Sequence, residues 1–171
     1  MMSKALGAML ILGVGSYMGY ALFLRYQNRI KNLDGFLTAL RMLAAHMGFC
    51  AGWLSDIFLE ISKAPLGAVS QVFLEAHTQC EKGEMPSGAL WHAVETHQKK
   101  LSFLKEDKMI LKEWLETLGK SDTAQEMQYI KATEDLLRCQ KEKAVLRAQK
   151  EGKLSAGFCM IGSLFLVILF W

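Results

Sequence analysis

A histidine, a thiol and a carboxylate stand close together at His77, Cys80 and Glu81. On a helix, spacings of three and four residues bring side chains to one face, so this group resembles half of a zinc site. A structural zinc needs four ligands, and no second pair with ligand spacing completes the set. We therefore predict that the chain has no metal site.

The other residues capable of chemistry do not form a catalytic arrangement. His92 and His97 are five residues apart and would not share a helix face, and no serine lies in a nucleophile elbow. The phosphate-binding pattern G-x-x-x-x-G-K-[ST] is absent, so the chain is not the ATP-hydrolysing part of a P-loop machine. We predict that the protein is not an enzyme and has no catalytic residues, cofactor-binding residues or cofactor.

The four cysteines do not form a recognisable zinc-binding or disulfide pattern. Cys50, Cys80, Cys139 and Cys159 are widely spaced, with no C-x-x-C pair. Such spacing is not typical of a disulfide framework, and it fits a reducing compartment. We expect four unpaired thiols.

Charged residues are missing from both ends of the 171-residue chain. None occurs from Ala5 to Leu24 or from Leu154 to Trp171, whereas the segment Arg25–Lys153 carries every charged residue except Lys4. A helix needs about 20 apolar residues to cross the hydrocarbon core of a bilayer. The sequence therefore predicts a transmembrane anchor at residues 1–24, a helical domain at residues 25–153 and a second transmembrane helix at residues 154–171.

The first apolar segment has an alternative interpretation as a signal peptide. Gly19-Tyr20-Ala21 is a weak small-x-small cleavage pattern. The apolar stretch is longer than the roughly 7–15 residues of a signal peptide, and no A-x-A site follows it. We favour a retained anchor.

Small residues in both ends suggest that the helices pair. Gly15 and Gly19 form a G-x-x-x-G motif, and Ser155, Cys159 and Ser163 give the second end a comparable face. Small residues let helix backbones approach closely in lipid, although such motifs also arise by chance. Pairing between the two spans, with other proteins, or with further copies in a homo-oligomer stays open.

Basic residues on the inner flanks of the two spans predict the orientation. Arg25, Arg29 and Lys31 follow the first span. The second span is preceded by Arg138, Lys141, Lys143, Arg147, Lys150 and Lys153. Because Lys and Arg concentrate on the cytoplasmic side, the middle domain should face the cytoplasm, although Lys4 slightly opposes this. The formal net charge of +3 does not indicate a nucleic-acid partner.

The hydrophobic periodicity predicts an all-α protein, a bundle of about six helices with a transmembrane helix at each end. Apolar residues recur every three and four positions, and strand alternation and hairpin signals are absent. The first span should continue as one helix through Met47, and a second helix should end near Ala64. Pro65 suits the first turn of a third helix that ends at Gly83, before a loop through Gly88. A fourth helix should reach Leu101.

The last two helices are predicted from their ends. Gly119 should terminate the fifth helix, and Asp122 should cap the sixth, with Gln125 completing a capping box. The sixth helix should run unbroken into the second span, with Gly152 and Gly157 as sites for a bend. Its charged residues, from Glu126 to Glu151, are either a solvated surface with local Glu134–Arg138–Glu142 pairs or a docking face for a cytoplasmic partner.

The order of these features resembles a known family. An apolar anchor and a helical domain precede the step Leu118-Gly119-Lys120-Ser121-Asp122-Thr123-Ala124-Gln125, which is followed by a long charged helix. The chain then closes with Lys153-Leu154 and a terminal run ending Leu166-Val167-Ile168-Leu169-Phe170. This is similar to stage III sporulation protein AB of endospore-forming bacteria over essentially the whole chain. The family's usual threonine-proline-leucine step is replaced here by Ala51-Gly52-Trp53-Leu54.

The resemblance implies a function that the residues alone do not. It implies a non-enzymatic membrane scaffold in the channel complex between mother cell and forespore, located on the mother-cell side in the outer forespore membrane. The partners it implies are other proteins of that complex, including a cytoplasmic secretion-type ATPase, by similarity to the platform protein of type II secretion. The alternative is a membrane-tethered helical adaptor or assembly factor unrelated to sporulation. Fold similarity alone is a weak basis for mechanism.

Overall fold

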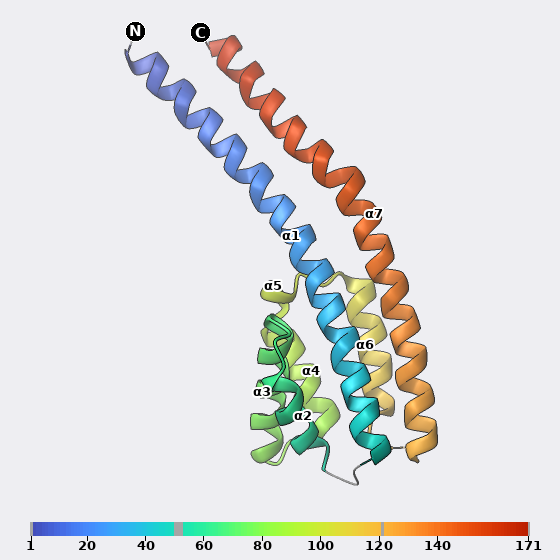
Figure 1. Ribbon diagram of the computed structural model, residues 1–171. Helices are drawn as coiled ribbons and strands as arrows, with labels where there is room; N and C mark the ends of the chain where they lie inside the picture. Colours follow the sequence, from blue (N-terminus) through green and yellow to red (C-terminus); the bar gives the residue numbers. More distant parts are fainter. Residues whose placement is uncertain (1, 50–52, 121, 171) are drawn as a thin grey trace. The chain divides into compact units, whose positions relative to one another are not determined.

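The protein is described by a computed structural model (Figure 1) that gives the backbone of residues 2–49, 53–120 and 122–170. Side chains are described for most of residues 14–47, 53–120 and 122–150. All the regular structure in these residues is α-helical. The helices are α1 (Met2–Phe49), α2 (Leu54–Lys63), α3 (Ala68–Glu81), α4 (Pro86–Thr96), α5 (Gln98–Leu101), α6 (Lys105–Thr117) and α7 (Thr123–Phe170). The predicted all-α fold is confirmed over the described residues.

Three details of the predicted helices were wrong. The described residues contain seven helices because the expected fourth helix breaks at His97, leaving α5 as a separate turn that ends at Ser102 in the left-handed conformation. Pro65 lies outside α3, which begins at Ala68 after Gly67 adopts a positive φ of 66°. The loop after α3 ends at Met85, because Pro86 occupies the first turn of α4, where its missing N–H costs nothing.

The two long helices form as the sequence predicts. α1 continues without interruption from the apolar end into the domain, and α7 continues from the domain into the second apolar end. The backbone divides into two compact units, one containing residues 1–27 and 143–171 and the other containing Asn28–Glu142. Each long helix therefore contributes to both units.

The predicted membrane spans lie largely outside the described side chains. Among the residues that the structure does describe, no helix combines the length and the apolar character needed to cross a bilayer. The predicted bend sites Gly152 and Gly157 likewise fall among residues whose side chains are not described.

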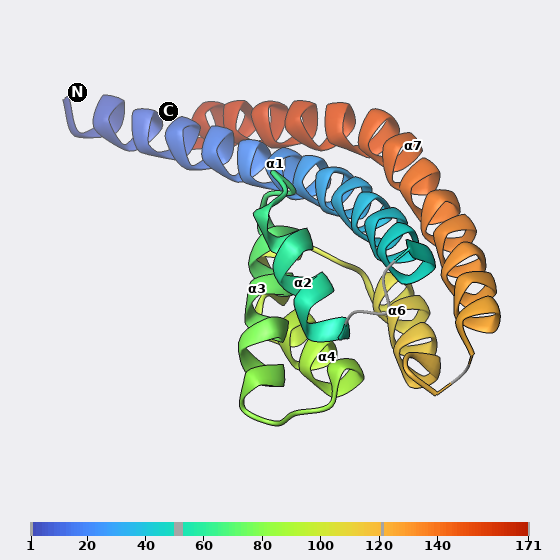
Figure 2. The same cartoon turned by 60° about the horizontal axis from the view of Figure 1, so that its bottom comes forward.

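The Asn28–Glu142 unit is built around the second half of α1. In both views this part of α1 lies between the α2–α4 group and the part of α7 that ends at Glu142 (Figures 1 and 2). α3 packs against α2 and α4, and α4 also contacts α6. Aromatic rings join these layers. The ring centroid of Phe36 in α1 lies 5.7 Å from the centroids of both Phe73 and Phe103, and the centroids of Phe73 and Phe58 are 5.6 Å apart. Burial of these side chains, roughly 1.5–3 kcal/mol each, holds the unit together.

Most of the core follows the predicted apolar stripes. The completely buried residues include Leu33, Leu40, Ile61, Val72, Leu90 and Leu111. On α7, Ile130, Leu137, Ala144 and Ala148 are buried as expected, but Met127 is 43% exposed. Its first-turn neighbour Glu126 is buried instead. The buried face of α7 therefore begins at Glu126, one residue before the apolar Met127 that was expected to begin it.

The junction between α6 and α7 shows what Gly119 and Asp122 do in the Leu118–Gln125 segment that carries the family resemblance. Gly119 has a φ of +77°, a left-handed conformation that glycine adopts most readily. Its N–H donates to Oε1 of buried Glu126. The N–H of Gln125 donates to Oδ1 of Asp122 over 2.9 Å, which confirms the predicted N-cap of α7. The Gln125 side chain makes no return bond in the described structure, so only half of the capping box forms.

Candidate functional site

A buried ion pair fixes α1 to α6. The guanidinium of Arg29 donates from Nε to Oδ2 of Asp107 and from Nη2 to Oδ1, both over 2.8 Å. The side chain of Arg29 is 5% exposed and that of Asp107 is completely buried. This is the bidentate geometry in which a guanidinium and a carboxylate bind most specifically. Oδ2 of Asp107 also accepts the N–H of Leu104, which satisfies a free donor at the start of α6.

An amide one helical turn further along α1 fixes the short helix α5. Nδ2 of Asn32 donates to the carbonyl oxygens of Lys100 and Leu101, each over 3.0 Å. These carbonyls lie at the end of α5, where no further helical turn can accept from them. We call Arg29, Asn32 and Asp107 the clamp, because together they bind the link from α5 to α6 against α1.

The clamp was not predicted from the sequence. Arg29 was expected to be one of the free basic residues beside the first span, but the structure places this charge inside the protein, paired with a residue 78 positions away. A usable signal was present: Arg29, Asn32 and Phe36 follow the same three- and four-residue spacing as the core positions of α1. A charge on a buried face requires a buried partner.

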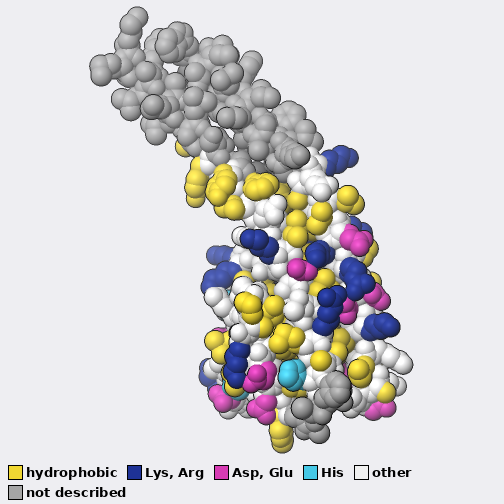
Figure 3. Space-filling model, in the orientation of Figure 1, with side chains coloured by type: hydrophobic (Ala, Val, Ile, Leu, Met, Phe, Trp, Pro, Cys, Tyr) yellow, Lys and Arg dark blue, Asp and Glu magenta, His cyan; other side chains and the backbone are white. Residues whose placement is uncertain are grey.

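Two exposed ion pairs connect α1 to α7. Nη2 of Arg41 lies 2.6 Å from Oε1 of Glu134, and Nζ of Lys141 lies 2.6 Å from Oδ1 of Asp34. Arg138 contacts the same Glu134 at 2.9 Å, which confirms one of the predicted local pairs. Its other contact is Asp135 and not the predicted Glu142. Figure 3 shows acidic and basic side chains lying close together on the face drawn. Exposed pairs of this kind contribute at most about 1 kcal/mol each.

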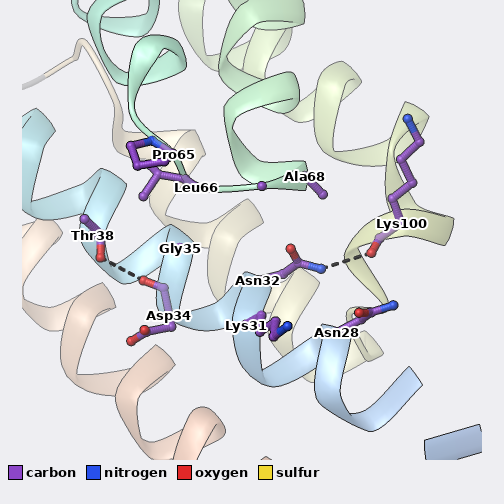
Figure 4. A pocket seen from close by; sticks show the side chains of 11 residues that line it. Asn28, Lys31, Asn32, Asp34, Gly35, Thr38, Pro65, Leu66, Ala68 and Lys100 are labelled. Carbon is purple, nitrogen blue, oxygen red and sulfur yellow. Dashed lines mark hydrogen bonds between the residues drawn. The ribbon is translucent and has the colours of Figure 1, made fainter. Parts of the chain in front are cut away.

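A polar hollow lies where α1 passes the link between α2 and α3 (Figure 4). It has a volume of about 580 Å³, and its polar walls include Lys31, Asn32, Asp34 and Lys100. Three of these groups already have partners: Asn32 holds two carbonyls, Asp34 accepts from Lys141, and Lys100 donates to Gln71. Most of the polar groups that line the hollow are thus engaged within the protein.

The residues first considered for a metal do not come together as a site. Nδ1 of His77 lies 3.0 Å from both the hydroxyl and the carbonyl oxygen of Ser55, which ties α3 to α2. The other ring nitrogen of His77, Nε2, lies 3.6 Å from Oε1 of Glu81. In the described part of the chain, no group of three or more His, Cys, Asp or Glu side chains could hold a metal ion.

Cys80 is poorly suited to act as a nucleophile. Burial, and to a smaller extent the nearby Glu84 carboxylate, raise the pKa of its thiol. A raised pKa lowers the fraction of reactive thiolate at neutral pH. Cys80 and the exposed Cys139 are both unpaired, while Cys50 and Cys159 lie outside the described side chains.

Among the described side chains of the Asn28–Glu142 unit, large apolar groups are most exposed in two links. Trp53, before α2, is 83% exposed, and Met85, before α4, is 75% exposed. Isolated apolar residues are common on protein surfaces and need no explanation. These two positions nevertheless offer probes of whatever contacts the unit.

Comparisons with known proteins agree on one family. The sequence profile of the family "Stage III sporulation protein AB" matches residues 4–171. The curated Stage III sporulation protein AB of Bacillus subtilis (strain 168) is 25% identical over 169 residues, which cover 98% of this chain and 99% of that protein.

A solved structure has the same fold. It is described as Stage III sporulation protein AB (SpoIIIAB), and it superposes with a TM-score of 0.66 at 24% identity. The match covers 71% of this chain and 96% of the solved chain. The resemblance predicted from the order of the sequence features is therefore confirmed.

Proposed function

The chain belongs to the stage III sporulation protein AB family, and on this basis we propose that it is a non-enzymatic membrane scaffold of the channel complex between mother cell and forespore. In this proposal residues 1–24 and 154–171 anchor the protein in the outer forespore membrane on the mother-cell side. Residues 25–153 form a domain that faces the cytoplasm and couples a secretion-type ATPase to the membrane components. Family membership favours this role over that of an adaptor unrelated to sporulation.

The observation that best supports a scaffold is the way α1 is held. α1 runs from the apolar end into the domain as one helix, and the clamp fixes it to α5 and α6 shortly after the apolar segment ends. A helix fixed by a bidentate buried pair cannot rotate or slide without breaking charged hydrogen bonds. A force applied to the domain would thus reach the apolar end directly.

Several of the titratable side chains considered for chemistry hold parts of the fold to one another. Asn32, Asp34 and Lys100 of the polar hollow already have partners. His77 is held by Ser55, and the pKa of Cys80 is raised. Two of the buried charged groups, Arg29 and Asp107, satisfy each other, and neither lines the polar hollow. Their arrangement suits mechanical connection.

Site-specific photo-crosslinking in sporulating cells would test the proposed partners. A photoreactive amino acid at Trp53 or Met85, the exposed link positions, should crosslink the chain to other proteins of the complex, including the ATPase. Leu74, which is 49% exposed in the middle of α3, provides a control position of similar character. Absence of the ATPase from the products of both link positions would count against coupling, and products confined to vegetative proteins would count against the complex.

A further inference from the structure

The outer face of α7 carries a stripe of apolar residues that are exposed in the described structure. Tyr129 is 41% exposed and Leu136 is 51% exposed, and Ala132 and Cys139 are also exposed. The buried side of α7 is formed by other residues, Ile130, Thr133 and Leu137 among them. We call Tyr129, Ala132, Leu136 and Cys139 the outer stripe.

The spacing of the outer stripe is that of a helix-pairing seam. Its members are separated by three, four and three residues. Alternation of three and four gives the average repeat of 3.5 residues that places one helix against another along a seam. The spacing continues along α7 to Lys143 and to Leu146, which is 65% exposed. This stripe was not predicted from the sequence, because the exposed face of α7 was expected to carry charged residues.

We propose that the outer stripe is the seam of a parallel, in-register homodimer, in which α7 of one copy packs against α7 of a second copy. One set of core layers would contain Tyr129, Leu136 and Lys143. The alternate set would contain Ala132, Cys139 and Leu146. Each residue would face the same residue of the other copy. Such a two-fold interface needs only one self-complementary surface, which this helix supplies.

The charges beside the stripe favour a second copy as the occupant. Glu142 precedes Arg147 by five residues, and the two flank the seam on opposite sides. In a parallel pair this is the separation at which an acidic residue of one helix meets a basic residue of the other, twice by symmetry. Both residues are exposed, and neither forms an ion pair with another residue that the structure describes.

The direction of pairing rests on the proposed function. If the end of α7 is a membrane span, two copies in one membrane carry α7 in the same direction and at the same depth. That arrangement is the one in which the stripe meets itself in register. Lys143 would place two like charges in one core layer, which lowers stability but fixes register. We therefore expect pairing to be weak in dilute detergent and to require confinement in a membrane.

Disulfide trapping in vesicles tests the seam with a native cysteine. The full chain carrying Cys50→Ser, Cys80→Ser and Cys159→Ser retains only Cys139, and it would be reconstituted into phosphatidylethanolamine–phosphatidylglycerol vesicles. Mild oxidation should convert most of this chain to a covalent dimer on a non-reducing gel. The matched control adds Cys139→Ser and Lys131→Cys, which moves the thiol to an exposed position of α7 away from the stripe. It should remain monomeric.

Two further variants separate a specific seam from random collisions. Leu136→Glu, in an exposed position where folding should not suffer, should abolish the Cys139 dimer. Glu142→Arg should weaken trapping, and Glu142→Arg combined with Arg147→Glu should restore it. Equal trapping at positions 131 and 139, or no effect of Leu136→Glu, would overturn the proposal.

The same vesicles distinguish failure of this inference from failure of the proposed function. A chain that resists alkaline carbonate extraction but forms no Cys139 dimer would contradict the homodimer and leave the membrane scaffold intact. A chain that carbonate removes from the vesicles would contradict the membrane anchors, and the parallel seam that depends on them.

Discussion

Asp107 is completely buried, and its charge is balanced by the Arg29 guanidinium through two hydrogen bonds of 2.8 Å. Removing two charges from water is costly, and the cost is recovered only when each charge is fully satisfied by the other. The ion pair therefore specifies the position of α1 against α6 more than it adds to stability. The exposed pair Lys63–Glu60 is different: Lys63 lowers the pKa of the Glu60 carboxyl, but solvent screens the interaction.

Asp107→Asn should destabilise the folded chain by about 3–5 kcal/mol, because it leaves Arg29 charged and buried without its partner. Urea unfolding of the full chain in mild detergent, followed by circular dichroism at 222 nm, would measure the change. Glu60→Gln, which breaks the exposed pair, is the control and should leave the midpoint almost unchanged. An apolar replacement of both clamp charges, Arg29→Met with Asp107→Leu, should recover much of the loss. Equal midpoints for Asp107→Asn and Glu60→Gln would contradict the role given to this pair.

The helices themselves were largely predictable, since local signals determine them. Gly119 ends α6, and Asp122 begins α7, as their residue types indicate. The apolar stripes of α1 to α4 identified most of the core. The break between α4 and α5 was not predictable, because the apolar spacing carries on across His97 and only Ser102 marks the turn. The clamp was not predicted either, because no local pattern joins Arg29 to a residue 78 positions away.

Gly119→Ala should destabilise the chain by about 1–2 kcal/mol, because a side chain disfavours the left-handed conformation required at φ +77°. Space is not the cause, since the nearest atom to an added Cβ would be Cδ1 of Leu54 at 3.8 Å. Gly88→Ala is the control: Gly88 lies within α4, and an added Cβ would meet only the flexible end of Glu84 at 3.2 Å. Thermal unfolding of both variants tests this assignment, which fails if Gly88→Ala is the more damaging change.

At the scale of the whole molecule, the two long helices connect the Asn28–Glu142 unit to the two apolar ends. Burial of Arg29 removes one of the basic residues used to predict orientation. Arg25 and Lys31 remain exposed beside the first apolar segment, as do Arg138, Lys143, Arg147 and Lys150 before the second. The proposal that the domain faces the cytoplasm therefore still has its main basis.

A thiol in the link between α3 and α4 would test this orientation. Met85→Cys, introduced into a chain whose four native cysteines are replaced by serine, places an exposed thiol in the domain. In intact cells an impermeant maleimide should not label it, and labelling should appear once the membrane is permeabilised. Complete labelling before permeabilisation would reverse the proposed orientation.

The spore yield of a strain lacking this gene tests the central claim most directly. We expect heat-resistant spores to fall to background, with development stopping after engulfment, and a plasmid copy of the wild-type gene to restore them. Normal numbers of heat-resistant spores from the deletion strain would contradict the proposal that this chain is a required scaffold of the channel complex.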